Sequence, residues 1–212
     1  MKRMFAGVFA MAILSSLAFA QNKGGYKKGE FYFGYSNNQV DTGLDPDDTL
    51  DGLLAERVTY HGFEVAGVYN LNRYFGLKGD VSGGWNHTNF RVSTPGGDLA
   101  FKTKSSLYSF LGGVQVKDNL SGRRLKPFAH ALFGVGHSKI NLTNVSCPAG
   151  VDCSDLIGSD SETAFSAALG VGIDIKLSDQ VDLRAIQVDY NPTRFGDSMQ
   201  HNVRFGVGLV FK

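Results

Sequence analysis

The sequence is poor in proline and tryptophan, and neither sign of charge predominates. It holds 5 Pro and 1 Trp in 212 residues, and its formal net charge is +1. A charge balance this close to neutral provides no field that would attract nucleic acid. In contrast, there are 27 Gly, 16 Phe and 8 Tyr, a composition that favours strands, tight turns and closely packed backbones. We therefore expect an all-β protein without a nucleic-acid partner.

Long apolar runs are missing after the first 20 residues. The one such run, over 5–20, follows Lys2 and Arg3 and ends in Ala18-Phe19-Ala20, which places small residues where a signal peptidase cuts. A spanning helix needs about 20 apolar residues, and this run is shorter. The sequence therefore predicts a cleaved signal peptide over 1–20 and a single mature domain over 21–212. If that domain lies in a membrane, strands must span it.

Apolar and polar residues alternate with a period of two along the mature sequence, which is the period of a β-strand. In the C-terminal stretch, large apolar side chains occupy every odd position from 203 to 211, opposite Arg204 and two glycines. Within 181–190, Arg184 shares the parity of the apolar residues, which indicates a β-bulge. Eight such stretches are expected to be strands: 29–36, 59–71, 75–86, 99–117, 126–142, 163–177, 181–190 and 203–212.

The connections between these stretches alternate in length. Residues 72–74, 118–125 and 178–180 form short connections, whereas 37–58, 87–98, 141–162 and 191–199 form longer ones. Short periplasmic turns and long outer loops are typical of outer-membrane barrels. Together with the export signal, this pattern makes lipid the solvent of the apolar face. We predict an eight-stranded antiparallel up-and-down β-barrel in the cell outer membrane, with its last strand paired to its first.

Charged residues lie mid-strand on the face opposite the aromatic residues. The lumen of an eight-stranded barrel is just wide enough for side chains to fill it. Charges buried there singly are costly, so they are expected to pair in a network that plugs the lumen, in preference to forming an ion path or a wide pore. Arg204 is expected to pair with Glu64, Asp80 or Asp174. The predicted lumen network is Glu64, Lys78, Asp80, Asp174, Lys176 and Arg204.

Four features carry a resemblance to a known family: the signal peptide, the hairpin over 69–77, the strand entry over 126–131, and the terminal aromatic residue. They resemble the small bacterial outer-membrane β-barrels, which include the opacity proteins and the transmembrane domain of OmpA-type proteins. The resemblance implies insertion by the outer-membrane assembly machinery, which recognises a C-terminal strand that ends in an aromatic residue. In this sequence the signal would consist of Phe205, Val207, Leu209 and Phe211. The sequence departs from the family pattern in that Lys212 follows the final aromatic residue. No peptidoglycan-binding domain is expected after the barrel. A structural role, or contact with a surface ligand or host matrix through the outer loops, is expected.

Two features of the expected outer loops bear on their chemistry. Cys147 and Cys153 lie in one loop of an exported chain, which predicts a local disulfide, because metal ligands are lacking nearby. Aspartates crowd the segment 41–51, where carboxylates at this spacing are compatible with Ca²⁺. The ligand order of an EF-hand is absent, so a solvated acidic loop is preferred. We expect neither a cofactor nor a resident metal.

Two other functions are compatible with parts of the pattern. A lipid-modifying barrel, of the deacylase or acyltransferase class, needs a Ser and a His joined near the outer rim. His87 and His201 lie near loop ends, but their spacing does not demand a pairing with Ser93 or Ser198, and no enzymatic activity is expected. A soluble lipocalin-like barrel would bury the apolar face instead, and periodicity alone does not distinguish the two orientations.

Overall fold

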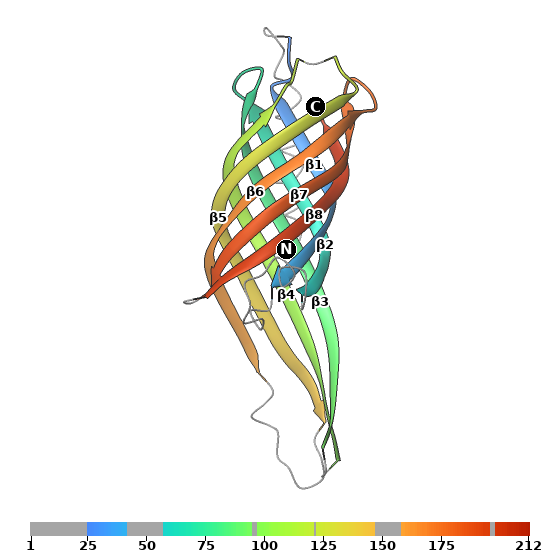
Figure 1. The fold of residues 1–212 in the computed structure, drawn as a ribbon, viewed down its shortest axis with the longest axis vertical. Coiled ribbons are helices and arrows are strands. Elements are labelled where there is room, and N and C mark those ends of the chain that lie inside the picture. Colours follow the sequence, from blue (N-terminus) through green and yellow to red (C-terminus); the bar gives the residue numbers. More distant parts are fainter. Residues whose placement is uncertain (1–24, 42–56, 95–96, 121, 147–157, 196–197) are drawn as a thin grey trace, which may run out of the picture.

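The protein is a closed barrel of eight antiparallel strands (Figure 1). The computed structural model describes residues 25–41, 57–94, 97–120, 122–146, 158–195 and 198–212. Each strand pairs with the next, and β8 pairs with β1, which confirms the predicted fold. The strands are β1 (Gly29–Asp41), β2 (Arg57–Asn70), β3 (Phe75–Thr94), β4 (Gly97–Lys117), β5 (Leu125–Ser146), β6 (Ser159–Lys176), β7 (Val181–Phe195) and β8 (Ser198–Phe211).

The wall of the barrel is apolar outside and polar inside. Phe33 is 55% exposed and Phe165 is 60% exposed, whereas the inward-facing Tyr32 is only 2% exposed. This orientation is the one expected for a barrel surrounded by lipid. The lipocalin-like alternative is wrong, because it requires the apolar face inside. Within the described ranges, no helix is both long and apolar enough to cross a membrane.

Three strands extend well beyond the length needed to span a bilayer. β3, β4 and β5 contain 20, 21 and 22 residues, whereas a tilted spanning strand needs about 9–11. In Figure 1 their outer ends project past the rest of the barrel. The long loop predicted over 87–98 is therefore mostly a hairpin, in which Thr94 pairs with Gly97. Backbone pairing thus continues past the point where the apolar alternation of the sequence has stopped.

The bulge expected in the seventh stretch is present in β7. Ile173 of β6 is opposite Ile186, but the next residue, Asp174, is opposite Arg184, so β7 contains one extra residue. The bulge shifts the parity of the strand. As a result Arg184 and Gln187 both point into the lumen, where they are 1% and 0% exposed.

Amphipathic rings gather on the outward face toward the end of the barrel that carries the long connections. The Trp85 indole N–H donates to the Tyr108 hydroxyl at 3.1 Å. Tyr35 stacks on His61 with its hydroxyl 2.5 Å from Nδ1, and Tyr190 makes a 2.5 Å contact with His201 in a second stacked pair. Rings with one polar end favour the membrane–water interface. We call these residues the outer aromatic belt.

Candidate functional site in the barrel lumen

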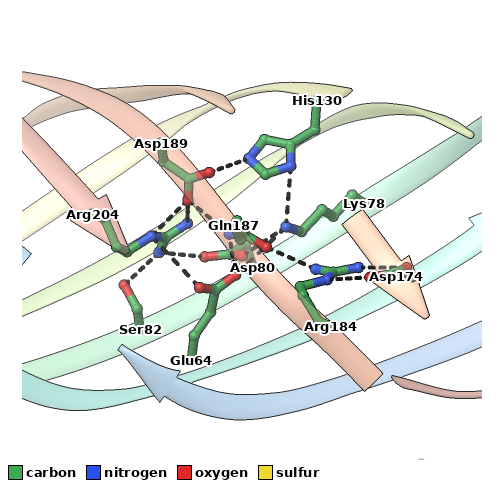
Figure 2. Close-up of polar contacts among 10 residues, drawn as sticks. All are labelled: Glu64, Lys78, Asp80, Ser82, His130, Asp174, Arg184, Gln187, Asp189 and Arg204. Carbon is green, nitrogen blue, oxygen red and sulfur yellow. Dashed lines mark hydrogen bonds and ion pairs between the residues drawn. The ribbon is translucent and has the colours of Figure 1, made fainter. Parts of the chain in front are cut away.

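A plug of ion pairs crosses the middle of the lumen, and Arg204 of β8 is its centre (Figure 2). Its Nη1 donates to Asp80 Oδ1 at 3.0 Å and to Ser82 Oγ at 2.9 Å. On the other side, Nε and Nη2 contact Asp189 Oδ2 at 2.8 and 2.6 Å. Glu64 lies 3.6 Å from Nε, and the Arg204 side chain is fully buried. One guanidinium therefore joins carboxylates from three strands, β2, β3 and β7.

Lys78 and His130 complete this cluster from β3 and β5. The Lys78 ammonium lies 3.2 Å from Asp80 and 3.6 Å from Glu64. The His130 ring lies between Lys78, 3.5 Å from Nδ1, and Asp189, 3.1 Å from Nε2. Since burial of an unpaired charge is costly, this mutual pairing is what allows so many ionisable groups inside the wall.

A second cluster lies on the periplasmic side of the first. Arg184 donates to Asp174 Oδ1 at 2.9 Å, and its guanidinium lies over the rings of Tyr32 and Phe128, at 4.3 and 4.0 Å from their centroids. Lys117 is 3.2 Å from Asp174 and also forms an ion pair with Glu30. These contacts extend the plug toward the periplasmic turns.

Gln187 links the two clusters. It accepts a hydrogen bond from Arg184 at 2.8 Å, and its amide donates to Glu64 at 2.9 Å and to Asp189 at 2.7 Å. Gly170 provides room beside this junction, because a Cβ there would lie 2.0 Å from Asp189 Oδ1 and 2.4 Å from His130 Nε2. The lumen is therefore filled at this level by side chains, and it is not a wide pore.

Most of the predicted network comes together, with one error. Glu64, Lys78, Asp80 and Arg204 meet in the first cluster. Asp174 is buried as expected, but its arginine partner is Arg184. The prediction for Lys176 is wrong: its ammonium is 2.6 Å from Asp179, and both side chains lie at the turn after β6, where water reaches them.

Sequence reasoning missed several members of the plug, among them Glu30, Lys117, His130, Arg184, Gln187 and Asp189. His130 lies on the polar face of its strand, so the alternation itself was a usable signal. Asp189 and Gln187 follow the bulge of β7, where the parity of the strand changes. In the sequence, the only sign of this change of parity is Arg184, which shares the parity of the apolar residues that follow it.

Each end of the lumen has a pocket. The outer one, of about 360 Å³, is lined by three acidic residues and many hydroxyl and amide groups, and its described lining contains no Lys, Arg or His. The inner one, of about 200 Å³, is lined largely by lysines. The outer pocket is lined by Val40, Asp41, Val58, Tyr60, Asn86, Thr88, Thr103, Ser105, Leu107, Ser138, Ile140, Asp160, Ser161, Glu162 and Gln200.

The C-terminal strand closes the barrel with its large apolar residues outside. These are Phe205, Val207, Leu209 and Phe211, which are 39–43% exposed on the lipid-facing surface. Their role in recognition by the assembly machinery stays a prediction. Lys212 folds back over the periplasmic end, where its backbone N–H donates to the Gln180 carbonyl at 2.9 Å and its ammonium is 2.5 Å from Asp182.

Several predictions fall outside the described residues. These are the signal peptide over 1–20, the disulfide between Cys147 and Cys153, and most of the acidic segment 41–51, of which Asp41 alone is described, at the end of β1. They stay predictions.

Comparison with known proteins agrees with the geometry. The family described as outer membrane protein beta-barrel domain matches residues 6–211. Among solved structures, Neisserial surface protein A has a TM-score of 0.57 at 12% identity, over 89% of this chain and 99% of that one. The attachment invasion locus protein Ail of Yersinia pestis, in complex with the heparin analogue sucrose octasulfate, has a TM-score of 0.52 at 17% identity, over 86% and 97%. At these identities the likeness concerns the fold. Comparison with curated sequences gave no match.

Proposed function

Because the chain belongs to the outer-membrane β-barrel domain family, we propose that it is a non-enzymatic barrel whose outer end contacts a polyanionic ligand. The family and the fold place the protein in the cell outer membrane, in a structural or surface-interaction role. The plug fills the middle of the lumen, so a ligand outside the cell can reach only the outer end of the barrel. We therefore place the ligand contact there.

A group of basic side chains on the outer wall carries this proposal. His87 and Lys104 are direct cross-strand partners on β3 and β4, and both are exposed. Lys139 of β5 is exposed opposite Ser106, which shares the outward face of β4 with Lys104 and Lys102. Because cross-strand partners project from the same face, these charges stand together. We call His87, Lys102, Lys104 and Lys139 the outer basic patch.

The outer basic patch begins where the outer aromatic belt ends. Trp85 pairs with Ser106, and the next cross-strand pair on the same face, two residues farther along each strand, is His87 with Lys104. Rings of the belt mark the interface, so the patch lies at the level of the headgroups or beyond them. A large anion can therefore approach it from the cell exterior.

Sucrose octasulfate provides a probe for the proposed site, because it was bound by the Ail barrel, which has the same fold. Replacing both Lys104 and Lys139 with Gln is expected to weaken its binding to the purified protein roughly five- to tenfold at low salt, since each exposed ion pair contributes a modest free energy. Isothermal titration measures the dissociation constant. Raising the salt concentration should weaken wild-type binding as well.

Arg73→Gln, at a periplasmic turn outside both pockets, is the matched control and should bind the probe like wild type. Equal affinities for wild type and the double variant would contradict the proposed site.

The proposal also expects no change of membrane lipid by this chain. The His201 ring is engaged by Tyr190, and His87 lies beside Lys104, so alanine at either position should leave the lipid A species unchanged. Mass spectrometry of lipid A, from cells expressing wild type, either variant or no protein, tests this. A change of acyl chains that needs the protein and disappears with either histidine would identify an enzyme instead.

A further inference from the structure

The inner pocket concentrates positive charge at the periplasmic end of the lumen. It measures about 200 Å³ and lies between the ends of β1, β4, β5, β6 and β8. Five of its lining residues are lysines, against two acidic residues. The lining consists of Gly25, Lys27, Glu30, Lys117, Asn119, Leu120, Gly122, Lys126, Lys176, Asp179 and Lys212.

Two of these lysines share a single carboxylate. Lys126 and Lys212 approach the same oxygen, Oδ2 of Asp182, at 3.4 and 2.5 Å. Asp182 is fully buried and does not line the pocket itself. The two ammonium groups repel each other, and one carboxylate does not neutralise both.

The acidic residues of the pocket are already engaged by other lysines. Glu30 forms an ion pair with Lys117, which also contacts Asp174 at 3.2 Å. Asp179 is 2.6 Å from the Lys176 ammonium. Counting side chains, the surplus of positive charge therefore lies on the side of Lys126 and Lys212, with Lys27 exposed at the rim.

We propose that the inner pocket binds a small oxyanion of the phosphate class between Lys126 and Lys212. A tetrahedral oxyanion has acceptors in several directions and suits ammonium groups, each with three donors. Pockets for drug-sized ligands measure roughly 300–1,000 Å³, so this smaller one fits a single ionic group.

The lowered pKa of Lys212 agrees with a pocket in which positive charge is not fully balanced by carboxylates. Burial lowers the pKa of its ammonium, the hydrogen bond to Asp182 opposes this, and the nearby Lys126 lowers the pKa further. An oxyanion between the two lysines would offset both lowering effects.

Two sources present this chemistry at the inner end of the barrel. One is free phosphate in the periplasm, and the other is the phosphate in the headgroup of a phospholipid of the inner leaflet, which is the leaflet on the periplasmic side. Both would use the same two lysines, so the same variants test both sources.

The full chain, folded in phosphate-free detergent, is titrated with inorganic phosphate and separately with dihexanoyl phosphatidylglycerol, and binding is followed by ³¹P NMR. We expect saturable binding of at least one probe, weakened roughly tenfold in Lys126→Gln and in Lys212→Gln, because each loses a charge-assisted hydrogen bond. Binding of inorganic phosphate identifies the free anion, whereas binding of the lipid alone identifies the headgroup.

Arg194→Gln, which removes an exposed cation of β7 outside both proposed sites, is the matched control and should bind like wild type. Each variant keeps one lysine on Asp182, and a heat-dependent shift in gel mobility verifies that it is folded. The absence of saturable binding to both probes would overturn the proposal, as would equal affinity in wild type and both folded variants.

Discussion

Replacing Arg204 with methionine is expected to lower the free energy of unfolding of the barrel by about 3–5 kcal/mol, the cost typical of breaking a buried ion pair from one side. The arginine contacts Asp80 at 3.0 Å, Asp189 at 2.6 Å and Glu64 at 3.6 Å, all inside the wall. Lys78 can compensate Asp80 and Glu64 only in part, and Asp189 would keep only His130 and Gln187. The loss comes mainly from the carboxylates that remain buried.

Urea unfolding of the protein in lipid vesicles measures this effect, and gel mobility after graded heating provides a second readout. Arg194→Met is the matched control, because Arg194 is exposed, and it should change the stability little. If stranded carboxylates are the cause, Asp189→Asn should recover part of the loss in the Arg204→Met background. A stability of the single variant within about 1 kcal/mol of wild type would contradict this account of the plug.

Alanine at Gly34 is expected to impair closure of the barrel between β1 and β8. Gly34 is directly opposite Gly208 at this seam. A Cβ on Gly34 would lie 2.3 Å from the Tyr32 hydroxyl and 2.4 Å from the Val207 carbonyl oxygen, and one on Gly208 would lie 2.4 Å from the Gly34 Cα. The Tyr32 ring would have to move, and because the Val207 oxygen and the Gly34 Cα are backbone atoms, the strands themselves would have to separate. Overpacking of this kind costs about 1–3 kcal/mol and occasionally more.

The effect should appear as slower folding into lipid vesicles and as a larger fraction of unshifted protein on unboiled gels. Gly34→Ala and Gly208→Ala are compared with Gly67→Ala and Gly79→Ala, since an added Cβ at the latter two meets nothing within 4 Å. Equal folding rates for all four variants would contradict the prediction, because β1 and β8 would then accommodate the added Cβ without a cost to closure.

The wall of the barrel was predictable because lipid imposes one simple rule on it. Each spanning segment must put apolar side chains outside, so apolar residues recur at every second position of the strand. Phe33 and Tyr35 show this pattern in β1, and Phe205 and Phe211 belong to it in β8. The short turns were predictable for a different reason. Asn and Ser favour turns because their side chains accept nearby backbone hydrogen bonds, as Asn72 and Ser178 do here.

The strand ends and part of the plug were not predictable in this way. Beyond Trp85, water replaces lipid, so β3 continues to Thr94 without an apolar face to indicate it. Asp189 was hidden by the bulge of β7, which exchanges the two faces of the strand. Lys176 has the correct parity but lies at the end of its strand, where a water-exposed partner, Asp179, is available. Parity specifies a face, whereas depth in the membrane decides whether a charge must find a buried partner.

The two pockets give the barrel an electrical polarity along its axis. Asp41, Asp160 and Glu162 line the outer pocket, and lysines line the inner one. Between them the side chains of the plug fill the lumen, so the opposite charges are separated by a zone of low dielectric constant in which their field is weakly screened. Within the lumen, acidic side chains therefore face the cell exterior and lysines face the periplasm, and the plug opposes the passage of ions between them.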